Sequence, residues 1–144
     1  MRIAVASDHG GYDLKEKLIP HLRNQGYDVV DLGTDSAASV DYPVFGKKCA
    51  EYVVGGEAER GVVMCGTGIG ISIAANKTKG ARCALVTSDE MARLASAHNK
   101  ANMLALGGRT TSSTDAARWI GIWLTTPFDG GERHTRRVAL LSEM

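Results

Sequence analysis

The chain of 144 residues is long enough for one domain, and its 44% hydrophobic and 23% charged residues are ordinary for a soluble globular protein. A formal net charge of +1 excludes a general attraction to nucleic acid or to an anionic membrane. No apolar run approaches the ~18 residues that a membrane span needs, and the N-terminus lacks a signal-peptide pattern. We therefore expect one cytoplasmic domain, residues 1–144, that binds neither nucleic acid nor membrane.

The three cysteines are odd in number and widely spaced, at Cys49, Cys65 and Cys83. They form no C-x-x-C pair, so the sequence suggests neither a disulfide framework nor a structural zinc site. This cysteine pattern is typical of a reduced compartment.

Short apolar runs alternate with helical patterns along the chain. Leu14, Leu18 and Leu22 share one helix face, with Pro20 as a possible kink or boundary and Gly26 as a C-terminal cap. The strands are expected at 2–6, 27–32, 62–65, 82–86 and 102–106. The helices are expected at about 14–24, 43–54, 69–77, 88–95, 113–124 and 132–142, the fourth capped by Thr87 or Ser88.

This alternation predicts a doubly wound α/β domain: five parallel strands, helices on both faces and a C-terminal helix. In such sheets ligands bind at the carboxyl ends of the strands. Polar residues follow three expected strands. Asp8 and His9 follow the first, Cys65 the third and Arg109 the fifth.

The most informative stretch runs from Gly61 to Lys77, where an apolar run ends in Cys65 and is followed by Gly66, Gly68 and Gly70. This pattern indicates a strand, a tight glycine turn and a helix N-terminus. The backbone N–H groups of such a turn suit an anion or oxyanion, and they favour the thiolate of an adjacent cysteine.

Alternative interpretations of this stretch are weaker. It is a poor dinucleotide fingerprint, because Ile71 stands where the last glycine is needed, and no G-K-[ST] follows for a P-loop. The turn could instead be a packing turn without a ligand. Cys65 could be a buried small hydrophobe, an interpretation that fits Cys49 and Cys83 better.

Other polar residues admit structural and functional interpretations. His9 before two glycines favours a functional role, whereas His98 could be a helix C-terminal cap. Arg133 and Arg137 share one face of the last helix, which is a solvated basic face or a phosphate site. Together with Cys65, these groups suit proton transfer next to a carbonyl of a phosphorylated substrate. Covalent catalysis by the cysteine remains an alternative.

Six segments carry a resemblance to a known family. They are S-D-H-G-G at 7–11, D-Y-P at 41–43, C-G-T-G-I-G-I-S-I-A-A-N-K at 65–77, H-N at 98–99, G-G-R at 107–109 and R-H-x-x-R at 133–137. In this order they resemble the ribose-5-phosphate isomerase B family, which includes the galactose-6-phosphate isomerase subunits. The resemblance covers essentially the whole chain.

The resemblance implies aldose–ketose isomerisation of a sugar phosphate without a metal or organic cofactor. It makes Cys65 the base between C2 and C1, and it assigns ring opening to His98. It also implies a homodimer or a dimer of dimers with active sites shared between subunits. The remaining roles are enediolate stabilisation by Thr67 and the amides of Gly66, Gly68, Ile69 and Gly70, sugar binding by Asp8 and Asn99, and phosphate binding by His9, Arg109, Arg133 and Arg137.

The chain departs from the family's usual pattern in two places. Glu132 is inserted before the R-H pair, and Ser96, Ala97 and Lys100 replace usual residues around H-N. These changes affect the identity of the expected substrate more than the expected class of reaction. D-ribose 5-phosphate is the expected substrate. The alternatives are a tetrose 4-phosphate, allose 6-phosphate, galactose 6-phosphate, or a non-catalytic sugar-phosphate-binding role.

Overall fold

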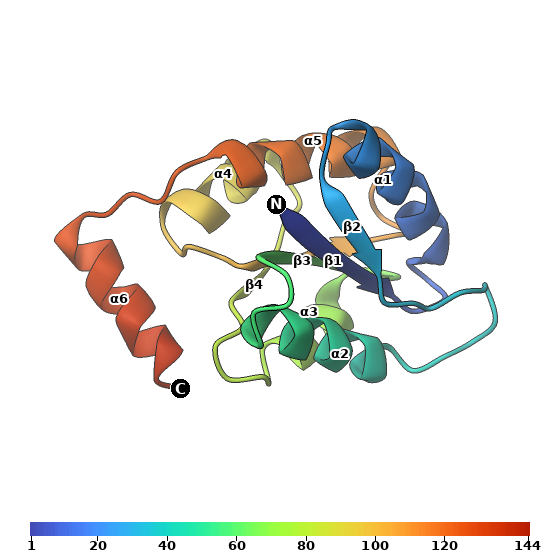
Figure 1. Ribbon diagram of the computed structural model, residues 1–144, viewed down its shortest axis with the longest axis horizontal. Coiled ribbons are helices and arrows are strands. Elements are labelled where there is room, and N and C mark those ends of the chain that lie inside the picture. The colour runs from blue at the N-terminus through green and yellow to red at the C-terminus, as the bar shows by residue number, and fades with distance from the viewer.

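A computed structural model describes residues 1–144 and shows a five-stranded parallel sheet covered by helices on both faces (Figure 1). This confirms the predicted fold class. The strands are β1 (Arg2–Ser7), β2 (Asp28–Asp31), β3 (Arg60–Cys65), β4 (Cys83–Leu85) and β5 (Met103–Gly107), and the sheet order is β2-β1-β3-β5-β4. The helices are α1 (Tyr12–Asn24), α2 (Tyr42–Val54), α3 (Ile69–Ala75), α4 (Asp89–Ala97), α5 (Ser113–Thr125) and α6 (Glu132–Ser142).

Residues that alternate along the central strands fill two separate cores. Val5, Met64 and Leu106 face the side covered by α1, α4 and α5, where Trp123 is also buried. Cys65, by contrast, faces the side covered by α2 and α3. Each large apolar side chain buried in this way contributes about 1.5–3 kcal/mol, so the sheet is the rigid base of the fold.

Local signals explain where several helices begin. Ser88 accepts the N–H of Met91 at 3.1 Å at the start of α4, and Ser112 accepts the N–H of Asp115 at 3.1 Å at the start of α5. Helix α1 continues through Pro20 instead of ending there, because the buried face formed by its leucines extends past the proline. Most strand boundaries differ from the predicted ones by a residue or two, which is the usual uncertainty.

The last helix is an exception to this packing. Helix α6 projects away from the body of the domain and has no buried residue (Figure 1). No helix is long and apolar enough to cross a membrane.

Candidate active site

The carboxyl ends of β1 and β3 lie at the topological switch point of the sheet, where doubly wound folds have their ligand-binding crevice. The helix after β1, α1, covers one face, and the helix after β3, α3, covers the other (Figure 1). Adjacent strands whose helices diverge in this way leave a ligand-binding crevice between their ends. Asp8 and His9 stand on one side of it, and Cys65 and Gly66 stand on the other.

Three turns meet at this crevice through close backbone contact. A Cβ placed on Gly10 would lie 2.9 Å from the amide nitrogen of Gly66, and one placed on Gly108 would collide with the carbonyl oxygen of Gly10. The N–H of Gly108 donates to the backbone carbonyl of Cys65 at 2.8 Å, and the N–H of Arg109 donates to the backbone carbonyl of Gly66 at 2.9 Å. Glycine is required here because the three turns approach closer than any side chain permits.

Cys65 is buried, with 5% of its surface exposed, and its Sγ accepts the N–H of Gly68 at 3.2 Å. This bond depends on the left-handed conformation of Gly68, which has a φ of 79°. An N–H donor aimed at sulfur complements negative charge on it, as a thiolate base requires. Cys65 is therefore buried but engaged in a polar contact.

The other two cysteines lack this environment. Burial raises the pKa of the Cys49 thiol to about 12, and it also raises the pKa of the Cys83 thiol above its ordinary value. Both remain protonated thiols at neutral pH. This agrees with the prediction that Cys49 and Cys83 are structural.

The turn after Cys65 offers several N–H groups without a protein acceptor, those of Gly66, Thr67, Gly70 and Ile71. The hydroxyl of Thr67 accepts the N–H of Ile69 at 3.2 Å and so stabilises the turn. Since α3 has only seven residues, these unpaired amides matter more than its dipole. They form a cradle for an oxyanion.

Charged and polar side chains surround this cradle. Asp8 is buried and its Oδ1 accepts the N–H of Gly11 at 3.1 Å. The guanidinium of Arg109 lies against Gly66, where an added Cβ would be 3.2 Å from Nη1, and it forms no ion pair within the chain. An anionic substrate therefore meets an uncompensated positive charge beside the cradle.

His9 is half-buried and its ring is oriented by a backbone contact. Its Nδ1 accepts the N–H of Val40 at 3.2 Å. Because Nδ1 accepts, the neutral ring carries its proton on Nε2, which is then free to donate to a ligand.

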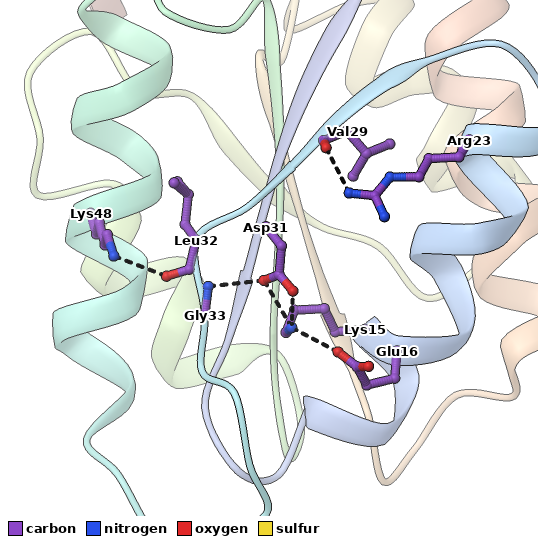
Figure 2. Close-up of polar contacts among 8 residues, drawn as sticks. All are labelled: Lys15, Glu16, Arg23, Val29, Asp31, Leu32, Gly33 and Lys48. Atoms are coloured by element: carbon purple, nitrogen blue, oxygen red, sulfur yellow. Dashed lines mark hydrogen bonds and ion pairs between the residues drawn. The ribbon is translucent and has the colours of Figure 1, made fainter.

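The loop that carries Val40 is anchored at its start by an ion pair between a buried lysine and an aspartate that solvent reaches (Figure 2). The fully buried ammonium of Lys15 lies 2.9 Å from both carboxylate oxygens of Asp31. Asp31 also accepts the N–H of Gly33 at 2.9 Å. The interactions of Lys15 thus join α1 to the end of β2 and fix where the loop leaves the sheet.

Sequence reasoning assigned no role to Tyr42, although it belongs to the D-Y-P segment. Its ring covers Gly70, where an added Cβ would lie 2.6 Å from the ring, and it is partly exposed. Tyr42 therefore forms one wall of the glycine turn. The D-Y-P segment was the available signal for this residue, whereas nothing in the sequence marks the Val40 amide.

The remaining predicted site residues do not join this group within one chain. His98 and Asn99 follow α4 and precede β5, so they lie at the amino edge of the sheet, opposite to Cys65. The five residues of β5 alone span about 13 Å. Arg133 and Arg137 are exposed on the projecting helix α6 and form no ion pair within the chain.

The departures from the family pattern all lie where α4 meets the segment that leads to α6. The hydroxyl of Ser96 donates to the carbonyl of Thr126 at 2.5 Å. The ammonium of Lys100 lies 5.5 Å from the centre of the Phe128 ring. Glu132 begins α6, where a carboxylate is favourable in the first turn.

No three His, Cys, Asp or Glu side chains are arranged to hold a metal ion. The oxyanion cradle, the buried thiol and the unpaired arginine instead form an arrangement that can move a proton next to a carbonyl.

Comparison with known proteins agrees with this chemistry. The family model described as Ribose/Galactose Isomerase matches residues 3–141. Ribose-5-phosphate isomerase B of Mycobacterium leprae is 41% identical over 144 residues, which cover 99% of this chain and 89% of that protein.

Solved structures extend the likeness to three dimensions. Ribose-5-phosphate isomerase B of Clostridium thermocellum has a TM-score of 0.97 and 50% identity, covering 99% of this chain and 96% of that one. The Mycoplasma genitalium enzyme, solved with bound ribulose-5-phosphate, has a TM-score of 0.93 and 38% identity, covering 99% and 94% of the two chains. The chain belongs to the ribose/galactose isomerase family and is an aldose–ketose isomerase.

Proposed function

We propose that the protein interconverts D-ribose 5-phosphate and D-ribulose 5-phosphate, with Cys65 as the proton-transferring base. The observation that carries this proposal is the buried Sγ of Cys65 beside a turn with four unpaired N–H groups and the unpaired Arg109. The names of the relatives and the ribulose-5-phosphate bound to the Mycoplasma genitalium enzyme support this choice of substrate.

The first step in the proposed reaction opens the furanose ring. The C1–O4 bond breaks, O4 gains a proton, and the hydroxyl on C1 becomes the aldehyde as it gives its proton to water, from which the group that protonated O4 is reprotonated. We assign the proton donated to O4 to His98, with Asn99 and Asp8 holding sugar oxygens. An imidazole suits this role because one ring nitrogen can donate a proton while the other accepts one.

The second step moves hydrogen from C2 to C1. The Cys65 thiolate removes the C2 proton, and the electron pair forms the C1–C2 double bond of an enediolate with its charge on O1. The O2 hydroxyl proton passes to O1, the carbonyl forms at C2, and the Cys65 thiol returns its proton to C1. No atom is gained or lost, and the thiolate is regenerated.

The glycine turn stabilises the charge that develops in this step. The unpaired N–H groups of Gly66, Thr67 and Gly70 suit the enediolate oxygens, since they are fixed before the reaction and need no reorganisation. Gly68 and Ile69 contribute differently, because their N–H groups already serve Cys65 and the Thr67 hydroxyl.

The phosphate is assigned to the groups farther from the thiol. His9 presents Nε2–H, and Arg109 presents a guanidinium at the same edge of the sheet. Arg133 and Arg137, at i and i+4 on α6, add two guanidinium groups, each of which can donate two parallel hydrogen bonds to phosphate oxygens.

A complete site then requires a second copy of the chain. Cys65 and His98 lie at opposite edges of one sheet, and α6 carries its arginines away from the body of its own chain. Exposed apolar residues stand both on α3, at Ile69 and Ile73, and on α6, at Leu140 and Leu141. A homodimer that buries them would bring His98 and α6 of one subunit toward Cys65 of the other.

A panel of four- to six-carbon sugar phosphates, assayed in both directions, tests this function. Ribose 5-phosphate should give the highest kcat/KM, and Cys65→Ala should abolish exchange of the C2 proton while leaving binding largely intact. Cys83→Ala is the matched control and should retain activity. If only a different sugar phosphate were turned over, ribose 5-phosphate would not be the substrate. Binding without any turnover would indicate a sugar-phosphate-binding protein instead of an enzyme.

A further inference from the structure

The imidazoles of His98 and His134 are stacked, with ring centroids 4.2 Å apart and planes inclined by 15°. His98 ends α4, and His134 lies in the first turn of α6. The R-H-x-x-R segment contains His134, but neither the sequence nor the proposed mechanism gives this histidine a role. The contact joins the proposed ring-opening residue to the helix that carries the phosphate arginines.

Asp129 is a second neighbour of His134, besides His98. Its Oδ1 accepts the N–H of Gly131 at 3.0 Å, and its Oδ2 lies 3.7 Å from Nε2 of His134. Its own N–H donates to the carbonyl of Ala97 at 2.8 Å, directly before His98. Asp129 therefore fixes the turn into α6 relative to the end of α4.

The stack matters because neither helix α6 nor the His98 ring is held by the buried cores of the domain. Helix α6 has no buried residue, and His98 forms no side-chain hydrogen bond in the chain, although its backbone N–H bonds within α4. Pairing two rings face to face restricts the rotation of both and leaves their nitrogens at the edges of the pair. The nitrogens of His98, which have no hydrogen-bond partner in the chain, are then available to a sugar oxygen.

We propose that His134 is a positioning residue for His98: by stacking, it holds the His98 imidazole in the orientation that ring opening needs. This inference rests on the proposed function, since it gives His98 its role there. It also implies that the seating of α6 and the orientation of His98 change together.

The test compares His134→Ala, which removes the stack, with His134→Phe, which keeps an aromatic face but no titrating group. Arg136→Ala on the same helix is the control. Two reactions are followed for each protein. One is isomerisation of ribose 5-phosphate. The other is deuterium incorporation at C1 of ribulose 5-phosphate in D2O, which needs Cys65 but no ring opening because this ketose has no free hydroxyl with which to form a furanose.

His134→Ala should lower the isomerisation rate by roughly tenfold or more, as misplacement of an acid–base group does. Exchange at C1 should change little. His134→Phe should restore isomerisation to within about threefold of the wild type, since the stacking contact returns. A parallel loss of isomerisation and exchange, no loss at all, or no rescue by phenylalanine would overturn the proposal.

A third measurement separates this inference from the proposed function. In the ligand-free protein, NMR of the His98 imidazole should show one ring orientation in the wild type and His134→Phe, and averaging in His134→Ala. If the wild type turned over no sugar phosphate, the proposed function would fail, and these spectra would still decide whether His134 orients His98. Identical His98 spectra in all three proteins would contradict the inference.

Discussion

The Sγ of Cys65 accepts the backbone N–H of Gly68, at 3.2 Å, across the turn that leads into α3. This bond links the proposed base to the backbone conformation of the turn, because Gly68 has a φ of 79°. The sulfur and the unpaired amides around it are thus held by one rigid segment, which is how a preorganised site lowers the cost of charge transfer.

Substitution of Gly68 should therefore damage both stability and activity. In Gly68→Ala the new Cβ would lie 2.8 Å from the carbonyl carbon of Leu106 and from Leu85, in addition to the strain of a left-handed alanine. We expect a loss of about 2 kcal/mol or more in the free energy of unfolding, measured by urea titration, and a fall in kcat.

Gly26→Ala is the matched control for this experiment. Gly26 has a φ of 93° with nothing within 4 Å of an added Cβ, so it tests strain alone. Its loss should be about 1 kcal/mol, with activity unchanged. Equal effects of the two substitutions would mean that packing at the turn contributes nothing.

The buried ammonium of Lys15 makes its partner Asp31 important for stability. Asp31→Ala leaves the Lys15 ammonium with weaker partners, the carboxylate of Glu16 at 3.1 Å and the Tyr12 ring, whose centre is 5.4 Å away. We expect unfolding in urea to show a loss of about 3 kcal/mol. Asp28→Ala, which removes the exposed ion pair with Arg2, should cost much less. A similar loss in both variants would contradict the importance of burial.

Stability should decline at high pH because of Cys49. Its pKa is raised by burial from an ordinary 9.0 to about 12, so the folded state holds its proton where the unfolded state loses it. Below pH 9 the Cys49 thiol is protonated in both states and costs the fold nothing. As the pH rises from 9 toward 12, the free energy of unfolding falls by about 1.4 kcal/mol per pH unit because of this group. Urea midpoints at several pH values should show a shallower decline in Cys49→Ala than in the wild type. Parallel declines would remove Cys49 as the cause.

The arginines of α6 should act on binding. Arg137→Ala should raise KM for ribose 5-phosphate about tenfold or more, since a charge-assisted phosphate contact is lost. Arg136→Ala changes a residue about 100° round the helix and should leave KM nearly unchanged. Steady-state kinetics of both variants provide the comparison, and an unchanged KM in Arg137→Ala would exclude it from the phosphate site.

Much of the fold could be predicted from the sequence because its signals are local. Apolar runs and glycine stops predicted the five strands, and the pattern from Cys65 to Gly70 predicted the turn that the structure contains. Parallel order then placed Asp8, His9, Cys65 and Arg109 at one edge without further information.

Other features depend on contacts that no local pattern encodes. The stack of His134 on His98 joins residues 36 positions apart, and the Val40 amide reaches His9 across a loop of mixed composition. Helical spacing also places Arg133 and Arg137 on one face without indicating that α6 leaves the body of the domain. Tertiary placement, which decides these cases, follows from packing between distant elements.

The central claim is that Cys65 of one subunit works with His98 of another, and complementation tests it most directly. Cys65→Ala and His98→Ala proteins, each impaired alone, are unfolded together and refolded as a mixture. If sites are shared, each mixed dimer contains one site with both native residues, so random pairing should restore about a quarter of wild-type activity toward ribose 5-phosphate. Activity no higher than the average of the two parents, in a mixture shown to contain mixed dimers, would contradict the account.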